Sequence, residues 1–303
     1  MGDDIVRTCR NRNCKIHKIK NLWDNTVYEG DISDKGDKVV IRTRPDVTIY
    51  DYVKGMDLSK VRQTPELANV ELTIDYAKGY SVMIDDIDKI QNDINAMDEW
   101  AMDGSEQLGI AIDRTILRGP SSEPSTDGLA KYAHSKNCGA TAGAITAGYN
   151  LGTSSSPIKL TRSNILNMIA VADAVLTEQN VPETDRWMII PAWAKMLINT
   201  SDLRSALFTG DQSNKVLRNG RMGMISNFTL YASNNLGVSS TTYWQIPFGH
   251  KSALCFASQL VKNRILELQN TWGTAMEGLH VFGYKVLKPE SLGYIYADKD
   301  LDA

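Results

Sequence analysis

The sequence contains no apolar run that approaches the roughly 18 to 20 residues needed to cross a bilayer. Its opening stretch, MGDDIVRTCR, lacks the apolar core of a secretory signal. Neither sign of charge dominates, because 33 Lys and Arg face 36 Asp and Glu over 303 residues, a net charge of −3. This balance disfavours a protein whose main task is to grip nucleic acid through a basic face. We therefore expect a soluble intracellular product with no membrane partner.

Cysteine is also scarce. The four cysteines are Cys9, Cys14, Cys138 and Cys255, too few for a disulfide framework in a chain of this length. Cys9, Cys14 and His17 have spacing that could hold zinc, but a structural site needs four ligands and no fourth is evident nearby. We keep these three residues as a weak metal candidate, which would suit a zinc-dependent nucleic-acid binder with salt-sensitive affinity. The favoured interpretation of residues 1–22 is a basic arm with incidental cysteines.

Catalytic motifs are missing too. The sequence has no H-E-x-x-H or G-x-S-x-G motif, and its glycine-rich stretch 139–148 matches no nucleotide-binding pattern. Asp85, Asp86 and Asp88 could serve a metal-dependent enzyme together with His250. Aspartates at the start of a helix are, however, explained by the helix dipole and by solvation. We therefore predict no enzymatic activity, no catalytic residue and no cofactor.

Two stretches in the first quarter of the chain alternate between apolar and polar residues, which predicts β-strands. They cover about 36–49 and 70–75, and together they form an extended hairpin. Its polar face carries Arg42, Arg44, Glu71 and Asp75. We expect the two arginines to oppose the two carboxylates across the strands if the register allows. The long connection carries apolar side chains that have no obvious local core, namely Tyr50, Tyr52, Val53, Met56 and Leu58.

The longest helical pattern follows, with isoleucines and other apolar residues recurring at three- and four-residue steps over 84–118. Ser81 is its expected N-cap, and Gly119-Pro120 ends it. The composition of residues 119–159 predicts a long irregular loop, which the resemblance described below would place as an insertion facing outside. Beyond it we expect a helix from Thr161 to Leu176, a short buried strand and further helix, and then strands over 222–233, 252–258 and 279–287. The predicted fold class is α+β.

Five stretches carry a resemblance: VYEGDISDKGDKVVIR (27–42), LTIDYAKGYSVMIDDIDKIQ (72–91), RWMIIP (186–191), MGMISNFTLYASNNL (222–236) and GLHVFGYKVLKPESLG (278–293). In their order and spacing they resemble the major capsid protein of tailed bacteriophages, the Hong Kong phage-type fold that herpesviruses and encapsulin shells share. Each stretch is a pattern rather than an invariant signature. The resemblance covers most of the chain, from about residue 25 to 296.

The resemblance implies a division of the chain into parts. Residues 1–26 would be an N-terminal arm and 27–79 an extended hairpin loop lying across a neighbouring subunit. The peripheral domain would comprise 80–159 and 271–303, with a spine helix over 84–118 and an inserted loop over 119–159. The axial domain would be 160–270. The residues named above in the hairpin would then be candidates for contacts between subunits.

The resemblance also implies a function. Copies of the chain would assemble as hexamers and pentamers into an icosahedral shell around phage double-stranded DNA, without binding it specifically. Expected partners are other copies, the portal protein, a scaffolding protein and a decoration protein. The shell would assemble in the host cytoplasm and become the virion capsid. The alternative within the same fold is an encapsulin-like shell that encloses a protein cargo.

Overall fold

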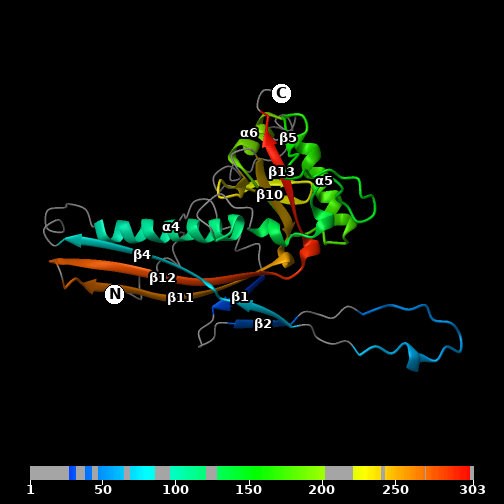
Figure 1. The fold of residues 1–303 in the computed structure, drawn as a ribbon, viewed down its shortest axis with the longest axis horizontal. Coiled ribbons are helices and arrows are strands. Elements are labelled where there is room, and N and C mark those ends of the chain that lie inside the picture. The colour runs from blue at the N-terminus through cyan, green and yellow to red at the C-terminus, as the bar shows by residue number, and fades with distance from the viewer. Residues whose placement is uncertain are drawn as a thin grey trace.

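The computed structural model describes residues 27–31, 38–42, 47–64, 69–85, 96–120, 128–201, 221–239, 243–269 and 271–300. Three parts project from a common centre (Figure 1). A long arm of strands and one helix extends to one side, a thin loop extends to the other, and a thicker body of sheet and helices stands above them. Within the described residues, no helix is both long and apolar enough to span a membrane.

The arm is a four-stranded sheet with one helix laid along it. Its strands, in spatial order, are β1 (Val27–Asp31), β11 (Leu254–Glu267), β12 (Gly273–Val286) and β4 (Tyr76–Asp85). The last three are antiparallel neighbours, whereas β1 pairs parallel with the start of β11. Helix α4 (Ala96–Arg118) runs beside β4 and buries Ile112 and Ile116. The arm is therefore a two-layer unit, with α4 on one face of the sheet.

The helix prediction over 84–118 was wrong at its start. Ile84 and Asp85 end strand β4, and Ser81 lies within that strand rather than at a helix N-cap. Exposure alternates along β4, and Tyr80, one of the more shielded residues, lies against α4. The described helix begins at Ala96 and ends, as predicted, just before Gly119, whose φ is +98°.

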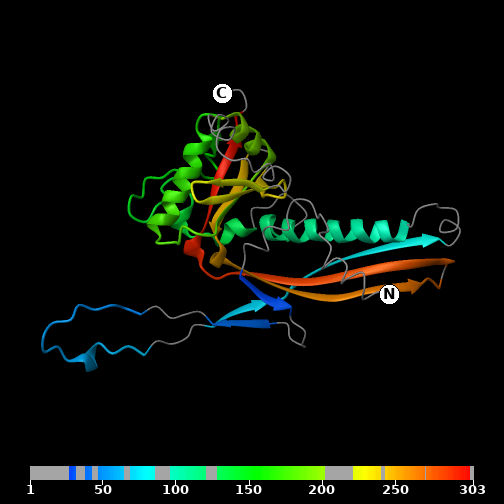
Figure 2. The ribbon, with the colours of Figure 1, turned by 180° about the vertical axis from the view of Figure 1, so that it is seen from behind.

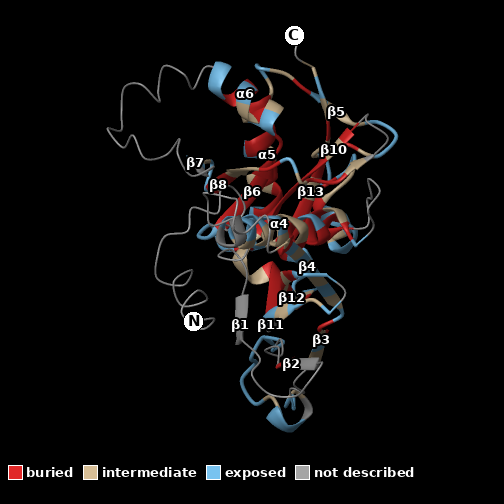
Figure 3. Ribbon diagram, turned by 90° about the vertical axis from the view of Figure 1, so that its left-hand side faces the viewer, coloured by how far each residue is buried: buried red, intermediate tan, exposed pale blue. Residues whose placement is uncertain are grey.

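The body is built on a seven-stranded sheet. The order is β5 (Ile158–Leu160), β13 (Leu292–Lys299), β10 (Tyr243–His250), β6 (Arg186–Ile190), β8 (Phe228–Ala232) and β7 (Arg221–Ile225), while β9 (Val238–Ser239) pairs with β10. Helices α5 (Ile165–Glu178) and α6 (Ala192–Thr200) pack against it. Strand β6 is buried at every position, which confirms the predicted short buried strand. In Figure 3 the buried residues gather in this body and along the centre of the arm.

Two further expectations needed correction. The segment 119–159 is not an outward-facing loop where the structure describes it, because Leu129, Ala142 and Leu151 are buried in the two large cores.

The two large sheets also do not follow the predicted domain boundary at residue 271. Strand β11 belongs to the arm although it lies before that boundary, and β13 belongs to the body although it lies after it.

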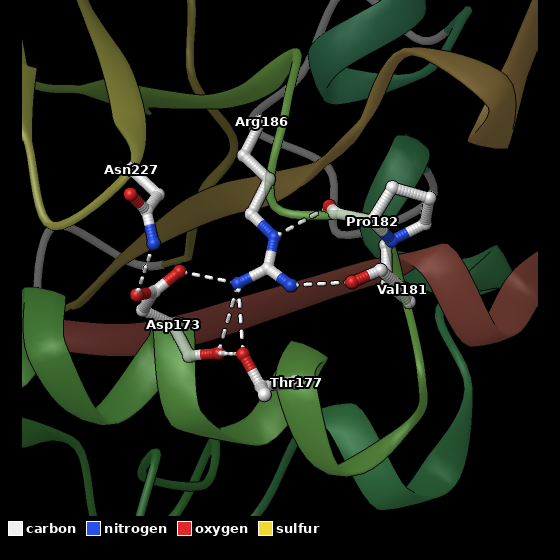
Figure 4. Close-up of polar contacts among 6 residues, drawn as sticks. All are labelled: Asp173, Thr177, Val181, Pro182, Arg186 and Asn227. Carbon is white, nitrogen blue, oxygen red and sulfur yellow. Dashed lines mark hydrogen bonds and ion pairs between the residues drawn. The ribbon is translucent and has the colours of Figure 1, made fainter.

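A buried arginine joins the elements of the body (Figure 4). The guanidinium of Arg186 forms an ion pair with Asp173 on α5 and donates to the carbonyl oxygens of Pro182 (2.9 Å) and Val181 (2.5 Å). The other carboxylate oxygen of Asp173 accepts a hydrogen bond from Asn227 (3.2 Å). Asn227 lies in the two-residue turn between β7 and β8 with φ +64°, which fits a tight hairpin turn. One fully buried cation therefore connects a strand, a helix and a hairpin turn.

Candidate inter-subunit contact surface

The base of the N-terminal hairpin is anchored to the arm. Strands β2 (Lys38–Arg42) and β3 (Asn69–Thr73) pair antiparallel, which confirms the predicted hairpin. The apolar residues at this base form a third core cluster with residues of β11: Ile41, Leu72, Ile74, Cys255 and Ala257. Leu72 is completely buried. The base is therefore part of the folded core of a single chain.

A glycine lets the hairpin base approach the arm closely. A Cβ atom at Gly283 of β12 would lie 2.2 Å from the carbonyl oxygen of Thr73 and 3.0 Å from the Cα of Ile74. Backbone atoms cannot rotate away as a side chain could, so any larger residue there would push β3 outward. Gly283 thus helps to set where the hairpin leaves the arm.

The register of the hairpin corrects the expected charge pairing. Arg42 lies opposite Asn69, and Glu71 lies opposite Val40, so Arg42 and Glu71 are diagonal rather than direct neighbours. Asp75 follows the strand and accepts a hydrogen bond from the hydroxyl of Thr73 (2.8 Å). Arg44 lies outside the described residues. The alternation that predicted the strands was correct, but it could not determine the pairing offset.

Beyond the base, residues 47–64 form the tip of the hairpin, which extends far from the rest of the molecule (Figure 2). We call these residues the tip loop. Its limbs are linked at Thr48 and Gln63, whose backbone and side-chain amides exchange two hydrogen bonds of 3.0 Å. Asp57 caps a single 3₁₀ turn, η1 (Leu58–Lys60), by accepting from Ser59, and these hydrogen bonds lower the pKa of the Asp57 carboxyl. The tip loop therefore has local order without any core.

The predicted apolar contact residues lie together on this tip loop, whereas Arg42, Glu71 and Asp75 belong to the base of the hairpin. Its exposed large apolar residues are Val47, Ile49, Tyr50, Tyr52, Val53 and Leu58, and Met56 is half-buried. Ile49 is 87% exposed. Exposing so many apolar side chains on one thin loop is unfavourable in water and typical of a surface that another molecule covers.

Sequence reasoning missed other exposed apolar residues, on the arm: Met83, Trp100, Met102, Ile265, Trp272 and Leu279. No local signal in the sequence tells which face of a strand or helix stays uncovered. In the body, Ile145 is 83% exposed on a turn. There the carboxylate of Glu178 accepts from the backbone N–H of Ile145 (2.9 Å) and the hydroxyl of Thr146 (2.5 Å). These hydrogen bonds lower the pKa of Glu178 to about 2.

The structure does not bring together the residues that the sequence offered for a metal or catalytic site. His250 is half-buried, its Nδ1 accepts from the backbone N–H of Ser252 (3.1 Å), and burial lowers the pKa of its ring. Asp85 lies at the far end of β4, while Asp86 and Asp88 lie outside the described residues, as do Cys9, Cys14 and His17. Within the part of the chain that the structure describes, no group of three or more His, Cys, Asp or Glu residues is arranged to hold a metal ion.

Comparison with solved structures identifies the fold. The capsid structure of cyanophage P-SCSP1u matches with a TM-score of 0.64 and 15% identity, covering 94% of this chain and 90% of the other. The capsid of Ralstonia phage GP4 matches with a TM-score of 0.61 and 14% identity, covering 92% and 88%. This chain has the fold of phage major capsid proteins. A structure from Mycobacterium phage Che8 is 23% identical over 86% of this chain and 84% of its own, with a TM-score of 0.56.

The likeness is one of structure rather than of sequence. No protein-family model matches the chain, and no curated protein matches it either. The capsid-fold prediction and the α+β class are confirmed, because the matches cover the arm, the hairpin and the body together.

Proposed function

We propose that this chain is the structural major capsid protein of a phage head. Copies assemble as hexamers and pentamers into an icosahedral shell that encloses double-stranded DNA. The observation that carries the proposal is the capsid fold over nearly the whole chain, combined with a tip loop whose apolar residues are exposed in the single chain. In the shell, the tip loop of each copy lies across its neighbour.

The shape of the chain supports assembly rather than catalysis. A thin loop and a long arm extend from the body in opposite directions (Figure 1), so each copy presents much of its surface to neighbours. Contacts between unlike surfaces of identical copies produce rings where the rotation closes. A shell needs many such contacts, each of modest strength, and no site for a small molecule.

The remaining parts have roles in this proposal. The arm with α4 forms the peripheral domain and the seven-stranded body forms the axial domain, around which hexamers and pentamers close. A portal protein, a scaffolding protein and a decoration protein are the partners expected of such a shell. Assembly takes place in the host cytoplasm, and the product is the virion capsid.

Negative-stain electron microscopy with light scattering tests the proposal directly. The purified chain should form uniform shells tens of nanometres wide, or isolated hexamers and pentamers, alone or with a scaffolding protein. Shell contents then separate the alternatives, since DNA supports the phage head and a protein cargo supports an encapsulin-like compartment. A monomer or dimer that never assembles, even with a scaffold supplied, would refute the proposal.

A further inference from the structure

The outer face of α4 combines acidic and apolar residues near its N-terminal end. Glu99, Asp103 and Glu106 follow one another at four- and three-residue steps, so they share one side of the helix. Met102 and Trp100 lie beside them and remain 58% and 40% exposed. We call these five residues the α4 stripe.

The opposite side of the same helix is used by the fold. A Cβ atom at Gly104 would lie 2.9 Å from the ring of Tyr80 on β4, so this glycine faces the sheet and lets the aromatic ring fit beneath the helix. Leu108 and Ile112 continue that inner side into the core. The three carboxylates of the α4 stripe therefore lie on the side of α4 that points away from its own sheet.

The acidic side chains of the stripe have no cationic partner among the described residues. The ion pairs found there are Arg186 with Asp173 and Arg264 with Glu277, both elsewhere in the molecule. Three carboxylates along two turns of a helix repel one another. A cationic segment lying along them would remove that repulsion, and its apolar residues could cover Trp100 and Met102.

The chain itself contains such a segment. Residues 1–22 carry six Lys and Arg against two Asp, in a chain whose net charge is −3. The same residues include Ile5, Val6, Ile16 and Ile19. The tip loop is a poorer match, because its cations Lys54, Lys60 and Arg62 are largely offset by Asp51 and Asp57, so its net charge is +1 against +4 for residues 1–22.

We infer that the α4 stripe binds the basic segment 1–22 of a neighbouring copy. This inference rests on the proposed function, since it places the contact within the shell. The carboxylates attract the Lys and Arg side chains, and burial of Trp100 and Met102 supplies the apolar part of the contact. The basic segment then joins subunits and does not hold DNA.

Photo-crosslinking tests the inference on the full chain. Met102→p-benzoylphenylalanine is introduced, isotope-labelled and unlabelled copies are mixed before assembly, and crosslinked peptides are identified by mass spectrometry. The expected product joins position 102 to residues 1–22 of a copy with the other label. Tyr132→p-benzoylphenylalanine, an exposed aromatic position on the short helix η2 (Leu129–Tyr132), is the control and should not capture that segment.

Charge reversal adds a second readout. Glu99→Lys with Glu106→Lys should reduce the crosslink several-fold, whereas Glu183→Lys with Glu290→Lys, two exposed glutamates elsewhere, should not. Adding Arg7→Glu and Arg10→Glu to the first variant should restore it. Crosslinks to residues 47–64, to DNA, or only within one chain would overturn the inference. Microscopy of the same samples keeps it separate from the proposed function: absence of particles refutes the shell, and particles with the wrong crosslink refute only this contact.

Discussion

The base and the tip of the same hairpin contain the same kinds of residue but place them in opposite surroundings. At the base, Leu72 is completely buried against β11, and at the tip, Ile49 is almost fully exposed. The base gains its stability within one chain as soon as that chain folds. The tip has no such gain, so its apolar residues contribute only when another molecule covers them. Whether an apolar residue stabilises the single chain or a contact between molecules therefore depends on what covers it, and not on its residue type.

Substitutions in the tip loop should have the largest effect, and that effect should be on assembly. Ile49→Ser, Tyr52→Ser and Val53→Ser together should abolish shell assembly, as measured by light scattering and electron microscopy. The free energy of unfolding of the unassembled chain should change by no more than about 0.5 kcal/mol per site, because these side chains are exposed. Normal shells from this variant would show that the tip loop is not a contact between copies.

At the base, the effect should be on folding. Leu72→Ala should lower the free energy of unfolding by about 2–5 kcal/mol, because it removes a fully buried side chain and leaves a cavity. Urea denaturation of the unassembled chain measures this loss. Val53→Ala at the tip is the matched control and should change stability by less than about 0.5 kcal/mol. Equal effects at the two positions would remove the distinction between base and tip.

Substitution of Gly283 tests the close contact between the hairpin base and the arm. Gly283→Ala should cost about 1–3 kcal/mol, because its Cβ would collide with the backbone of Thr73. Gly109→Ala in α4 is the control, since open space surrounds its Cβ position. There alanine should stabilise the chain by about 0.5–1 kcal/mol through helix propensity. Opposite signs in thermal unfolding are the expected result, and a neutral Gly283→Ala would show that β3 can move away freely.

The smallest effect concerns an exposed residue that is nevertheless held in place, Ile145 on its turn. The pKa of Glu178 falls from 4.5 to about 2 because the folded turn donates hydrogen bonds to the ionised carboxylate. The resulting stability is fully present above the unfolded pKa and is lost as pH falls from about 4.5 toward 2. The protection of the Ile145 and Thr146 amides from hydrogen exchange, measured relative to the intrinsic exchange rate at each pH, should therefore fall over that range.

Glu178→Gln provides the control for this titration. The variant should show faster exchange at these two amides at neutral pH, and the specific change between pH 4.5 and 2 should disappear. If the variant retains the same pH dependence as the natural chain, another group is responsible for holding the turn.

The sequence determined the local pattern of much of this protein. Alternation predicted the hairpin strands, a short apolar run predicted β6, and isoleucine spacing with Gly119 predicted the end of α4. The order of five patterned stretches was enough to indicate the capsid fold, which the structural comparisons confirmed. These features depend on neighbours within a few residues, where side-chain periodicity directly reflects which face is buried.

Only the tertiary structure decided the rest. The hairpin register placed Arg42 opposite Asn69, and strand β4 occupies the expected start of the helix. Strand β11 lies in the sheet of the arm and β13 in the sheet of the body, the reverse of the predicted division. Each of these depends on contacts between residues far apart in the chain, which no local pattern encodes. For the same reason, the sequence could name the apolar residues of the tip loop, but only the fold showed that Leu72 has a core to enter and Ile49 does not.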